Sequence, residues 1–506
     1  MSTPENIAQA LSRIQEITKI NKGNIIRSQQ MLRADRELLM RMQWIQEIIK
    51  GWYLLVKPTL VKGDSSVWYA NFWDFLRIYL NVHFKDQYCL SAENSLDLHS
   101  GSSFIPKQVI VISSKGGGVP RGLPYDTSLF IYADLNNIPS EKTILQGLQV
   151  MSLPYALCKV PAIYFQKNSK EAEIALQLIR TASDLSEIIL KYNFKSAAVR
   201  LLGALRFLGK DKMADAISHD IESVGWKIKE ENPFIDTFAP LPSLLIKSPY
   251  AARISSFWRD TREKVISHFP SPPGALSDGA SYLNRLEDLY EKDAYNSLSI
   301  EGYQVDDELI ARVKNNNWNP DFHPNDLQER NVLAARGYYE ASLEVKKSIL
   351  RLFKGEKPGE VVEQDIKRWY QSLFAPMARA GVIRKEDVIG YRKAQVYIRG
   401  SRHVPLPKEA LIDAMETFFD CLKNEPHPAV RAVLGHYVFV YIHPYMDGNG
   451  RIARFLMNVM LASGGYPWTI IRVKRRDVYI HALEEAGPGK NIEPFVRFIT
   501  EEMHSS

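Results

Sequence analysis

Residues 443–454, HPYMDGNGRIAR, place a histidine, a carboxylate, several turn-forming residues and two arginines within twelve positions. Histidine suits a general base because its ordinary pKa lies near neutral pH. Glycines let successive backbone N–H groups converge on an anion, and arginines offset its charge. The pattern therefore predicts a site that holds an anion and moves a proton. The alternative is a simple turn, since Asp-Gly and Asn-Gly pairs are typical of turns.

Two helices are predicted on either side of this motif. Residues 428–442, PAVRAVLGHYVFVYI, are almost continuously apolar and long enough for a buried helix. Residues 451–465, RIARFLMNVMLASGG, have helical apolar spacing and end in two glycines. Pro444 disfavours the helical region at the preceding residue, so the first helix is expected to end near His443 and leave its ring projecting.

Arg451 and Arg454 are predicted to share one face in the first turn of the second helix. Two cations near a helix N-terminus oppose the helix dipole. This arrangement indicates that an anion occupies the space between them. The flanks of the motif look helical, whereas Asp-Gly and Asn-Gly turns normally join strands, and this weighs against the simple turn.

The motif resembles the signature of the Fic family, His-x-Phe-x-Asp/Glu-Gly-Asn-Gly-Arg-x-x-Arg, with Tyr445 where that family usually has Phe. The resemblance extends over about 280–500 and includes HVPLP and GYPWTIIRVKRRDVYIHALEEA. It implies a protein adenylyltransferase, which transfers AMP from ATP to a Ser, Thr or Tyr hydroxyl of a target protein, and it implies Mg²⁺. Gly450 stands where the similar, phosphate-transferring Doc toxins carry a lysine, which favours adenylyl transfer over kinase chemistry.

The same resemblance implies a role for each matching position. His443 is the catalytic base and Asp447 holds Mg²⁺. The segment 394–407, AQVYIRGSRHVPLP, resembles the family's flap, a β-hairpin that aligns the target; a surface hairpin without function is the alternative. The implied nucleotide contacts are Gly448, Asn449, Gly450, Arg451 and Arg454 of the motif, Tyr479 after it, and Ile398, Arg399, Gly400 and Ser401 of the flap, where the last four could instead contact the target.

An inhibitory helix is expected at 282–302. The helical stretch YLNRLEDLYEKDAYNSLSIEG ends at Gly302, as a C-terminal cap glycine would suggest. SLSIEG resembles the family's inhibitory motif, Ser/Thr-x-x-x-Glu-Gly/Asn, with Ser297, Glu301 and Gly302 in register. The resemblance implies that Glu301 pairs with Arg454 in the place of the ATP γ-phosphate. In some relatives the same glutamate positions water to remove AMP from the protein, so this reverse reaction stays open.

The first 60 residues read as helices followed by a hairpin, the order of a winged helix. They hold nine Lys or Arg and five Asp or Glu, an excess of four positive charges. Residues 20–230 resemble the abortive-infection type IV antitoxin family, which joins a winged helix to an α+β domain. This implies DNA binding, with Arg33, Arg36 and Arg41 as candidate contacts; solvated helix positions would look the same. A module that presents target proteins is the alternative.

The complete prediction is a multidomain protein: a winged-helix domain at 1–60, an α+β domain at 61–235, a linker or arm at 236–280, and a mainly α-helical Fic domain with the flap at 281–506. In QVIVISSKGGGVPRG a strand is expected to run into a Gly-rich loop after Lys115. This loop lacks the Gly-Lys-Ser/Thr of a phosphate-binding loop and is expected to be structural. The rival function is a DNA-binding transcriptional regulator whose Fic domain senses nucleotide.

The composition of the chain argues against a membrane-spanning, secreted or disulfide-rich protein. The chain has 506 residues, 45% hydrophobic, a net charge of +6 and three scattered cysteines. No stretch of about 18 apolar residues is present, and the N-terminus has no basic start followed by an apolar block. Three cysteines without a paired spacing argue against a disulfide framework and a thiolate zinc site. We expect a cytoplasmic protein that binds no membrane, acts on a target protein or on itself, and is compatible with a homodimer.

Overall fold

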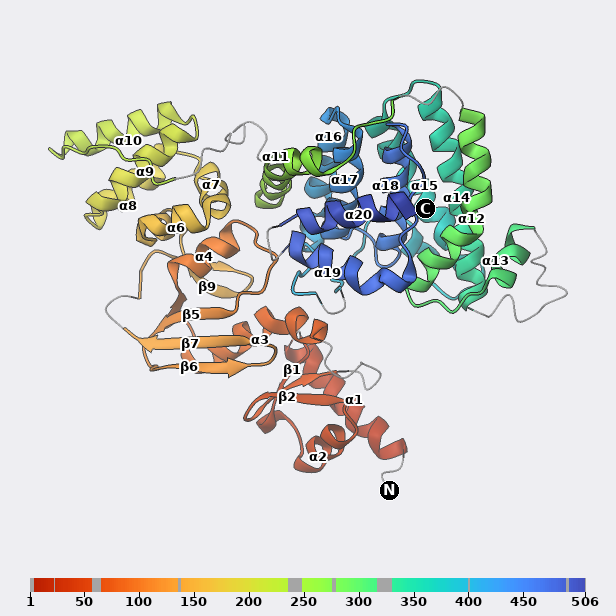
Figure 1. The fold of residues 1–506 in the computed structure, drawn as a ribbon. Coiled ribbons are helices and arrows are strands. Elements are labelled where there is room, and N and C mark those ends of the chain that lie inside the picture. The colour runs from red at the N-terminus through yellow and green to blue at the C-terminus, as the bar shows by residue number, and fades with distance from the viewer. Residues whose placement is uncertain are drawn as a thin grey trace. The chain divides into compact units, whose positions relative to one another are not determined.

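The computed structural model describes residues 4–21, 23–56, 65–134, 138–234, 248–274, 279–315, 330–398, 401–487 and 491–505. The chain forms two compact units (Figure 1). The first comprises Met1–Arg253 together with Tyr397–Val404, and the second comprises Ile254–Val396 and Pro405–Ser506. None of the described helices combines the length and apolar character needed to cross a bilayer.

The first unit begins with two helices and a three-stranded antiparallel sheet in the order β1-β3-β2. The elements follow the chain as α1 (Pro4–Asn21), β1 (Ile25–Arg27), the 3-10 helix η1 (Ser28–Gln30), α2 (Arg33–Arg41), β2 (Ile45–Ile49) and β3 (Trp52–Leu55). Ala10, Ile14 and Leu39 pack against Tyr53 in a small core. The predicted order of helices followed by a hairpin is confirmed by α1, α2 and the antiparallel pair β2 and β3.

A second sheet, in the order β4-β5-β7-β6, follows, with β5 and β7 parallel and the other pairs antiparallel. Its elements and the adjoining hairpin are α3 (Ser66–Phe84), β4 (Tyr88–Leu90), α4 (Ala92–His99), β5 (Gln108–Ser113), β6 (Gly117–Leu123), β7 (Thr127–Ala133), β8 (Lys142–Leu145) and β9 (Leu148–Met151). Phe72 and Phe75 of α3 share a core with Val111 of β5 and Leu129 of β7. The strand predicted at the start of QVIVISSKGGGVPRG is confirmed as β5.

The glycine-rich stretch after Lys115 differs from the prediction of a structural loop, because residues 117–123 form strand β6. Pro120 has no N–H to donate to a neighbouring strand, which a central strand would not tolerate. β6 lies at the edge of the sheet and pairs only with β7, with a register shift between Gly117 and Pro120. An edge position therefore explains how a strand accommodates this sequence.

Helices complete the first unit, as expected for an α+β fold. They are α5 (Leu153–Lys159), α6 (Ala162–Lys167), α7 (Ser169–Gln177), α8 (Ala182–Lys191), α9 (Lys195–Phe207) and α10 (Asp211–Ser223). Buried leucines and alanines of α9, including Leu201 and Leu205, share a core with Leu176 of α7 and Leu185 of α8.

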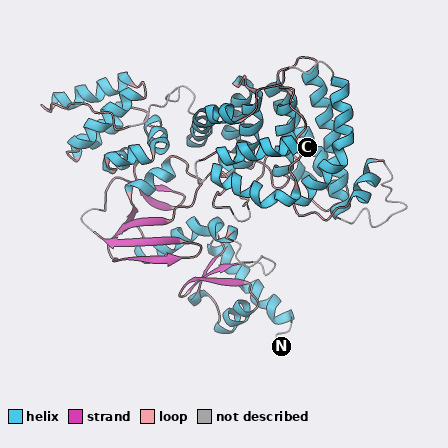
Figure 2. Cartoon of the chain, in the orientation of Figure 1, coloured by secondary structure: helices cyan, strands magenta, loops and turns pink. Residues whose placement is uncertain are grey.

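The described part of the second unit contains no strand, and Figure 2 shows the magenta strands in the first unit only. The α-helices are α11 (Pro249–His268), which begins in the first unit, α12 (Gly279–Ile300), α13 (Asp307–Lys314), α14 (Arg330–Phe353), α15 (Pro358–Arg379), α16 (Leu411–Asn424), α17 (Pro428–Ile442), α18 (Asn449–Ala462), α19 (Arg476–Ala486) and α20 (Glu493–Ser505). Short 3-10 helices are η5 (Lys385–Val388), η6 (Lys408–Ala410) and η7 (Val473–Arg475). The predicted mainly helical C-terminal region is confirmed, and α11 lies in the stretch predicted as a linker or arm.

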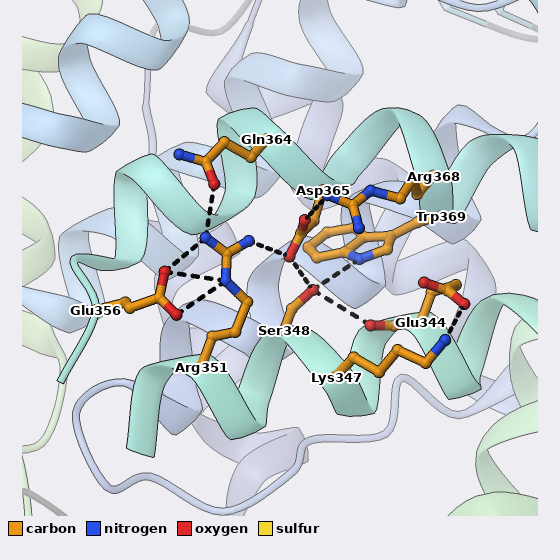
Figure 3. Close-up of polar contacts among 9 residues, drawn as sticks. All are labelled: Glu344, Lys347, Ser348, Arg351, Glu356, Gln364, Asp365, Arg368 and Trp369. Carbon is orange, nitrogen blue, oxygen red and sulfur yellow. Dashed lines mark hydrogen bonds and ion pairs between the residues drawn. The ribbon is translucent and has the colours of Figure 1, made fainter. Parts of the chain in front are cut away.

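A polar network joins α14 to α15 (Figure 3). Ser348 Oγ donates to Asp365 Oδ2 at 2.8 Å and accepts from Trp369 Nε1 at 3.0 Å. All three side chains are buried. Buried polar groups fix one packing arrangement when each has a partner. The network therefore sets the position of α15, which carries Tyr370 and Phe374 toward the motif.

The predicted hairpin at 394–407 is wrong for the described residues of that segment, where no strand forms. Pro405 and Pro407 lack the N–H groups that a ladder needs. The base of the loop is closed instead by a side chain, since Gln395 Nε2 donates to the Pro405 carbonyl at 2.7 Å.

The end of this loop pairs with a distant part of the first unit. His403 forms an isolated antiparallel bridge with Phe104. The Val404 N–H donates to the Ser103 carbonyl at 2.9 Å, and Arg402 Nη2 donates to the Ile105 carbonyl at 3.0 Å. Residues 402–404 thus find their backbone partners about 300 residues earlier in the chain, as the separations in sequence show.

Candidate active site

His443 directly follows α17, as predicted, and adopts a left-handed conformation with φ 54° and ψ 59°. Its Nδ1 lies 3.1 Å from the Val440 carbonyl oxygen. A carbonyl can only accept, so Nδ1 carries the hydrogen and Nε2 keeps the lone pair. Desolvation lowers the pKa of His443 to about 4, which leaves the ring neutral at neutral pH. The geometry therefore prepares Nε2 to accept a proton.

The loop between the two helices is fixed by Gly448 and Asn449. Gly448 has φ 79°, the only positive φ among residues 447–450, and a Cβ there would overlap the ring of Phe374. Asn449 accepts from the Tyr445 N–H at 3.0 Å and donates to the Tyr445 carbonyl at 2.9 Å. The Asn449 side chain thus serves the loop, and the group it can offer an anion is its backbone N–H.

The start of α18 presents backbone donors. The first N–H groups of any helix lack carbonyl partners within it and carry partial positive charge. Here the first hydrogen bond of the helix runs from the Ile452 N–H to the Gly448 carbonyl, so the N–H groups of residues 449–451 precede it. The backbone donors that the motif was predicted to present therefore come from this helix start, which follows one left-handed glycine.

Asp447 lies beside this helix start. Its Oδ1 accepts from the Gly448 N–H at 2.6 Å and lies 3.3 Å from Arg451 Nη2. Half of the side chain, 50%, is exposed. No group of three or more His, Cys, Asp or Glu side chains gathers among the described residues. A single open carboxylate nevertheless fits Mg²⁺, which is commonly held through one or two carboxylates together with substrate phosphates and water.

Arg451 is fully buried in a sandwich of aromatic rings. Its guanidinium carbon lies 5.0 Å from the centre of the Tyr303 ring and 5.1 Å from that of Phe374. Its Nε and Nη1 are buried and have no hydrogen-bond partner among the described residues. Buried donors without partners are costly, and an anion is the partner that suits them best.

Arg454 is held by the end of α12. Its Nη2 donates to Glu301 Oε1 at 2.8 Å and to the Ser297 carbonyl at 2.9 Å, while its Nε donates to Ser297 Oγ at 2.8 Å. α12 ends at Ile300, and Gly302 has φ +86°, as expected of a cap glycine. Arg454 is 4% exposed, so this pair replaces water around a buried cation.

Glu301 lies over the first turn of α18. A Cβ added to Gly450 would overlap Glu301 Oε1, so the carboxylate sits close above the backbone there. Burial alone would raise the pKa of Glu301, but Arg454 and Arg451 outweigh it and hold the pKa below its usual value. Burial likewise opposes the charge on Arg454, and Glu301 outweighs it and raises the pKa of that guanidinium. Both members of the pair, the Glu301 carboxylate and the Arg454 guanidinium, are therefore charged.

Two cavities border Asp447. One of about 250 Å³ lies on the Glu301 side and is lined by Glu301, Gly302, Tyr303, Arg330, Asn331 and Asp447. The other, of about 430 Å³, lies between the end of α15 and the motif, and its lining includes Tyr370, Tyr391, Met446 and Asp447. The carboxylate of Asp447 can therefore be approached from both.

Tyr479 lies deeper than its expected place beside a nucleoside. It is 2% exposed, and its hydroxyl is 2.8 Å from Nε2 of the buried His436, whose Nδ1 faces the Ala453 carbonyl. Arg454 contributes to lowering the Tyr479 pKa, although burial raises it to about 12 overall. In this structure Tyr479 contacts His436 of α17, which in turn faces the Ala453 carbonyl of α18.

The flap contacts are partly described. The Ser401 N–H donates to the Ile398 carbonyl at 3.1 Å. Ser401 Oγ accepts from the His403 N–H at 3.0 Å. Arg399 and Gly400 lie outside the described residues.

The basic residues of α2 differ in their surroundings. Arg33 and Arg41 are exposed, and Arg36 is half-buried. Arg33 donates to Glu37 at 2.7 Å within the helix, so part of its charge is already balanced. Asp35 of α2 is buried and accepts two hydrogen bonds from Arg13 of α1, so this pair joins α1 to α2.

Three residues of the site were not expected from the sequence: Tyr303, Phe374 and Arg392. Tyr303 follows Glu301 by two positions, and an aromatic residue so close to an expected arginine contact is a usable indication. Phe374 lies on the buried face of a helix, where any aromatic residue is typical. Arg392 precedes the flap by two residues, and its sequence neighbours give no sign of its contacts.

Comparison with known proteins shows that part of the chain is similar to the Fic/DOC family. Residues 360–461 match the family model described as the Fic/DOC family. The protein adenylyltransferase Fic of Drosophila willistoni is 45% identical over 115 residues, which are 22% of this chain and 22% of that protein. The protein of the same name from Nematostella vectensis is 46% identical over 113 residues, 22% of this chain and 26% of that protein. The chain thus spans about a quarter of the curated relatives it matches.

Among solved structures, Fic-1 (residues 134–508) from C. elegans aligns with 67% of this chain and 93% of its own, at 19% identity and a TM-score of 0.36. A TM-score of this size is too low to establish a shared arrangement over that length.

Proposed function

We propose that the protein is an adenylyltransferase that transfers AMP from ATP to a hydroxyl group of a protein. The observation that carries this proposal is the neutral His443 next to a helix start flanked by two buried arginines. The match to the Fic/DOC family model and the adenylyltransferase name of the curated relatives support it.

In the proposed reaction His443 Nε2 takes the proton of a Ser, Thr or Tyr hydroxyl. The hydroxyl oxygen forms a bond to the α-phosphorus of ATP, the bond from that phosphorus to the bridging oxygen breaks, and pyrophosphate leaves. A lone pair on Nε2, fixed by the Nδ1 contact to Val440, supports His443 in this role. Gly448, Asn449 and Gly450 are the proposed contacts of the phosphate oxygens. The N–H groups of Asn449 and Gly450 lie ahead of the first hydrogen bond of α18, whereas the Gly448 N–H donates to Asp447.

The two arginines have different proposed partners. Arg451, whose Nε and Nη1 lack hydrogen-bond partners among the described residues, offsets charge that develops on the α- and β-phosphates. Arg454 binds the γ-phosphate when it is not paired with Glu301. Asp447 would hold Mg²⁺, which would supply positive charge to offset that of the phosphates. Tyr479, Ile398, Arg399, Gly400 and Ser401 remain proposed contacts of the nucleotide or the target.

We also propose that the protein inhibits itself. Glu301 occupies the Arg454 donor that the γ-phosphate needs, and Ser297 and Gly302 hold the end of α12 in this position. ATP and Glu301 then compete for one guanidinium, so ATP binds without a productive arrangement while Glu301 is in place. A glutamate here is also suited to orient water for the reverse reaction, removal of AMP.

The test uses purified full-length protein, Mg²⁺ and ATP labelled at the α-phosphate, with label counted on the protein itself and on proteins of a cell lysate. The Glu301→Gly form is expected to incorporate label and the Glu301→Gly, His443→Ala form to lose at least about 100-fold of it. His427→Ala is the matched control, because His427 caps the opposite end of α17.

Incorporation that survives His443→Ala but not His427→Ala would contradict the assignment of the base. Absence of label from every form would contradict adenylyl transfer itself. Label that decays faster in the wild type than in Glu301→Gly would support the reverse reaction.

For the front of the chain we propose a winged-helix domain that binds DNA through Arg33, Arg36 and Arg41. The element order α1, β1, α2, β2, β3 and the exposure of two of these arginines support this proposal. Loss of binding to the upstream DNA of its own gene in Arg33→Ala, Arg36→Ala, with the exposed Lys19→Ala as control, would be the expected mobility-shift result. Equal binding by both variants would favour the alternative, a module that presents target proteins. A cytoplasmic location and a homodimer remain parts of the proposal.

A further inference from the structure

Arg392 contacts three carbonyl groups from three segments of the second unit. Its Nε donates to the His443 carbonyl at 2.8 Å, its Nη1 donates to the Ala394 carbonyl at 3.0 Å, and its Nη2 donates to the Leu406 carbonyl. Its backbone N–H donates to the Pro444 carbonyl at 2.9 Å. The side chain is 4% exposed, so water does not compete for these bonds.

The first of these bonds holds an unfavourable backbone conformation. A left-handed conformation is unfavourable for histidine, and it persists only when its surroundings hold it. The carbonyl of His443 and that of the next residue, Pro444, both accept from Arg392. The peptide that follows the proposed base is therefore fixed from one side by a single residue.

The other two bonds close the base of the 394–406 loop. Ala394 and Leu406 are its first and last residues, and one guanidinium joins their carbonyls. Gln395 adds a second closure through the Pro405 carbonyl. The ends of the segment that carries Ile398 and Ser401 are thus fixed to the same group that holds His443.

We propose that Arg392 is a positioning residue that sets the backbone of the base His443 and the base of the 394–406 loop in one mutual arrangement. This rests on the proposed adenylyl transfer. A planar guanidinium presents donors in fixed directions, which three carbonyls around one centre require. A lysine keeps the positive charge, but its single ammonium group cannot reach three carbonyls that lie in three different directions, so it cannot hold all three segments.

Charge offers a second readout beside geometry. The charged groups that act on His443 are Arg392 before the loop, Glu301 after α12 and Asp447 before α18. After desolvation, Arg392 contributes to lowering the His443 pKa, whereas Glu301 and Asp447 raise it. Removing the Arg392 charge therefore raises the pKa of His443, while exchanging Arg392 for lysine leaves it closer to the parent value.

The experiment compares Arg392→Lys and Arg392→Met in the Glu301→Gly protein. For Arg392→Lys we expect a loss of about 100-fold in kcat, since displacement of a catalytic group by about 1 Å has that effect, with KM for ATP changed by less than about twofold. For Arg392→Met we expect the same loss in kcat and a raised His443 pKa. The pKa is measured by NMR titration of protein labelled with ¹³C-histidine, in which the His443 signal is identified by its absence from the His443→Ala form.

Arg431 provides the matched control. It is also buried, lies near the start of the helix that His443 ends, and donates to the carbonyls of Glu425 and Pro426 at 2.6 and 3.0 Å. Arg431→Lys should lower stability without changing kcat or the His443 signal. If Arg392→Lys and Arg431→Lys have the same kcat, or if Arg392→Met leaves the His443 signal as in the control, the proposal is overturned.

The NMR arm separates the two proposals. If the Glu301→Gly parent incorporates no AMP, the proposed function fails. The shift and titration of the His443 signal in the Arg392 variants then still decide whether Arg392 positions that residue.

Discussion

Replacing Glu301 by glutamine removes the charge that faces Arg454, and replacing it by glycine removes the hydrogen-bond acceptor as well. A hydrogen bond between charged groups contributes about 1.5–3 kcal/mol, which corresponds to about 10- to 150-fold in the ratio of closed to open forms at 1.4 kcal/mol per factor of ten. A quarter of the Glu301 side chain, 26%, is exposed, so solvent screening moves the expectation to about 10- to 50-fold. Glutamine keeps a neutral acceptor worth about 1 kcal/mol, so its increase is smaller.

The assay is the initial rate of label transfer from α-labelled ATP, measured at one ATP concentration for the wild type and both variants. The expected order of rates is glycine, then glutamine, then wild type. Glu291→Gln is the control, because Glu291 lies on the same helix, α12, and pairs with Lys314 at 3.0 Å away from the site. Equal rates for all four proteins, or a glutamine form faster than the glycine form, would refute competition between Glu301 and ATP for Arg454.

Three further predictions concern pH and stability. Because the folded pKa of His443, about 4, lies below the unfolded value of about 6.5, its contribution to stability is present above pH 6.5 and is lost as the pH falls through about 4. The rate of Glu301→Gly should therefore fall only near or below pH 4; a midpoint near 6.5 would contradict a desolvated base. Tyr445→Phe should leave the free energy of unfolding unchanged or raise it by about 1 kcal/mol in urea titration, since the buried hydroxyl has no partner among the described residues; a loss above about 1 kcal/mol would reveal one. Ser348→Ala should lower the free energy of unfolding by about 1–3 kcal/mol, because Trp369 loses the acceptor for its buried N–H. Ser342→Ala on the same helix is the control, and equal losses in the two variants would contradict this account.

The polar motif and its two helices were predictable because their causes are local. Pro444, the glycines and the apolar period of each helix act within a few residues, and the helix ends at His443 and Gly302 follow from them. The position of Glu301 against Arg454 came from a resemblance, since no local rule joins residues 153 positions apart.

The contacts of Arg392 and the loop at 394–407 were not predictable in the same way. A Gly-Ser pair between extended residues is typical of a hairpin. In the structure the backbone partners of 402–404 come from residues 103–105, and Arg392 and Gln395 close the base of the loop. Strand β6 was not predictable either, because a proline is tolerated in a strand only at the edge of a sheet, and the order of strands is not evident from the local sequence.

The pairing of residues 402–404 with residues 103–105 bears on how this protein can be divided. A fragment beginning after Arg253 would keep every residue of the proposed catalytic motif but would remove Ser103, Phe104 and Ile105, the partners of His403 and its neighbours. Its loop would then expose backbone donors and acceptors that the whole chain satisfies. Residues 397–404 stand in the C-terminal part of the sequence but belong to the first unit, so a division of the chain by sequence alone would cut through that unit.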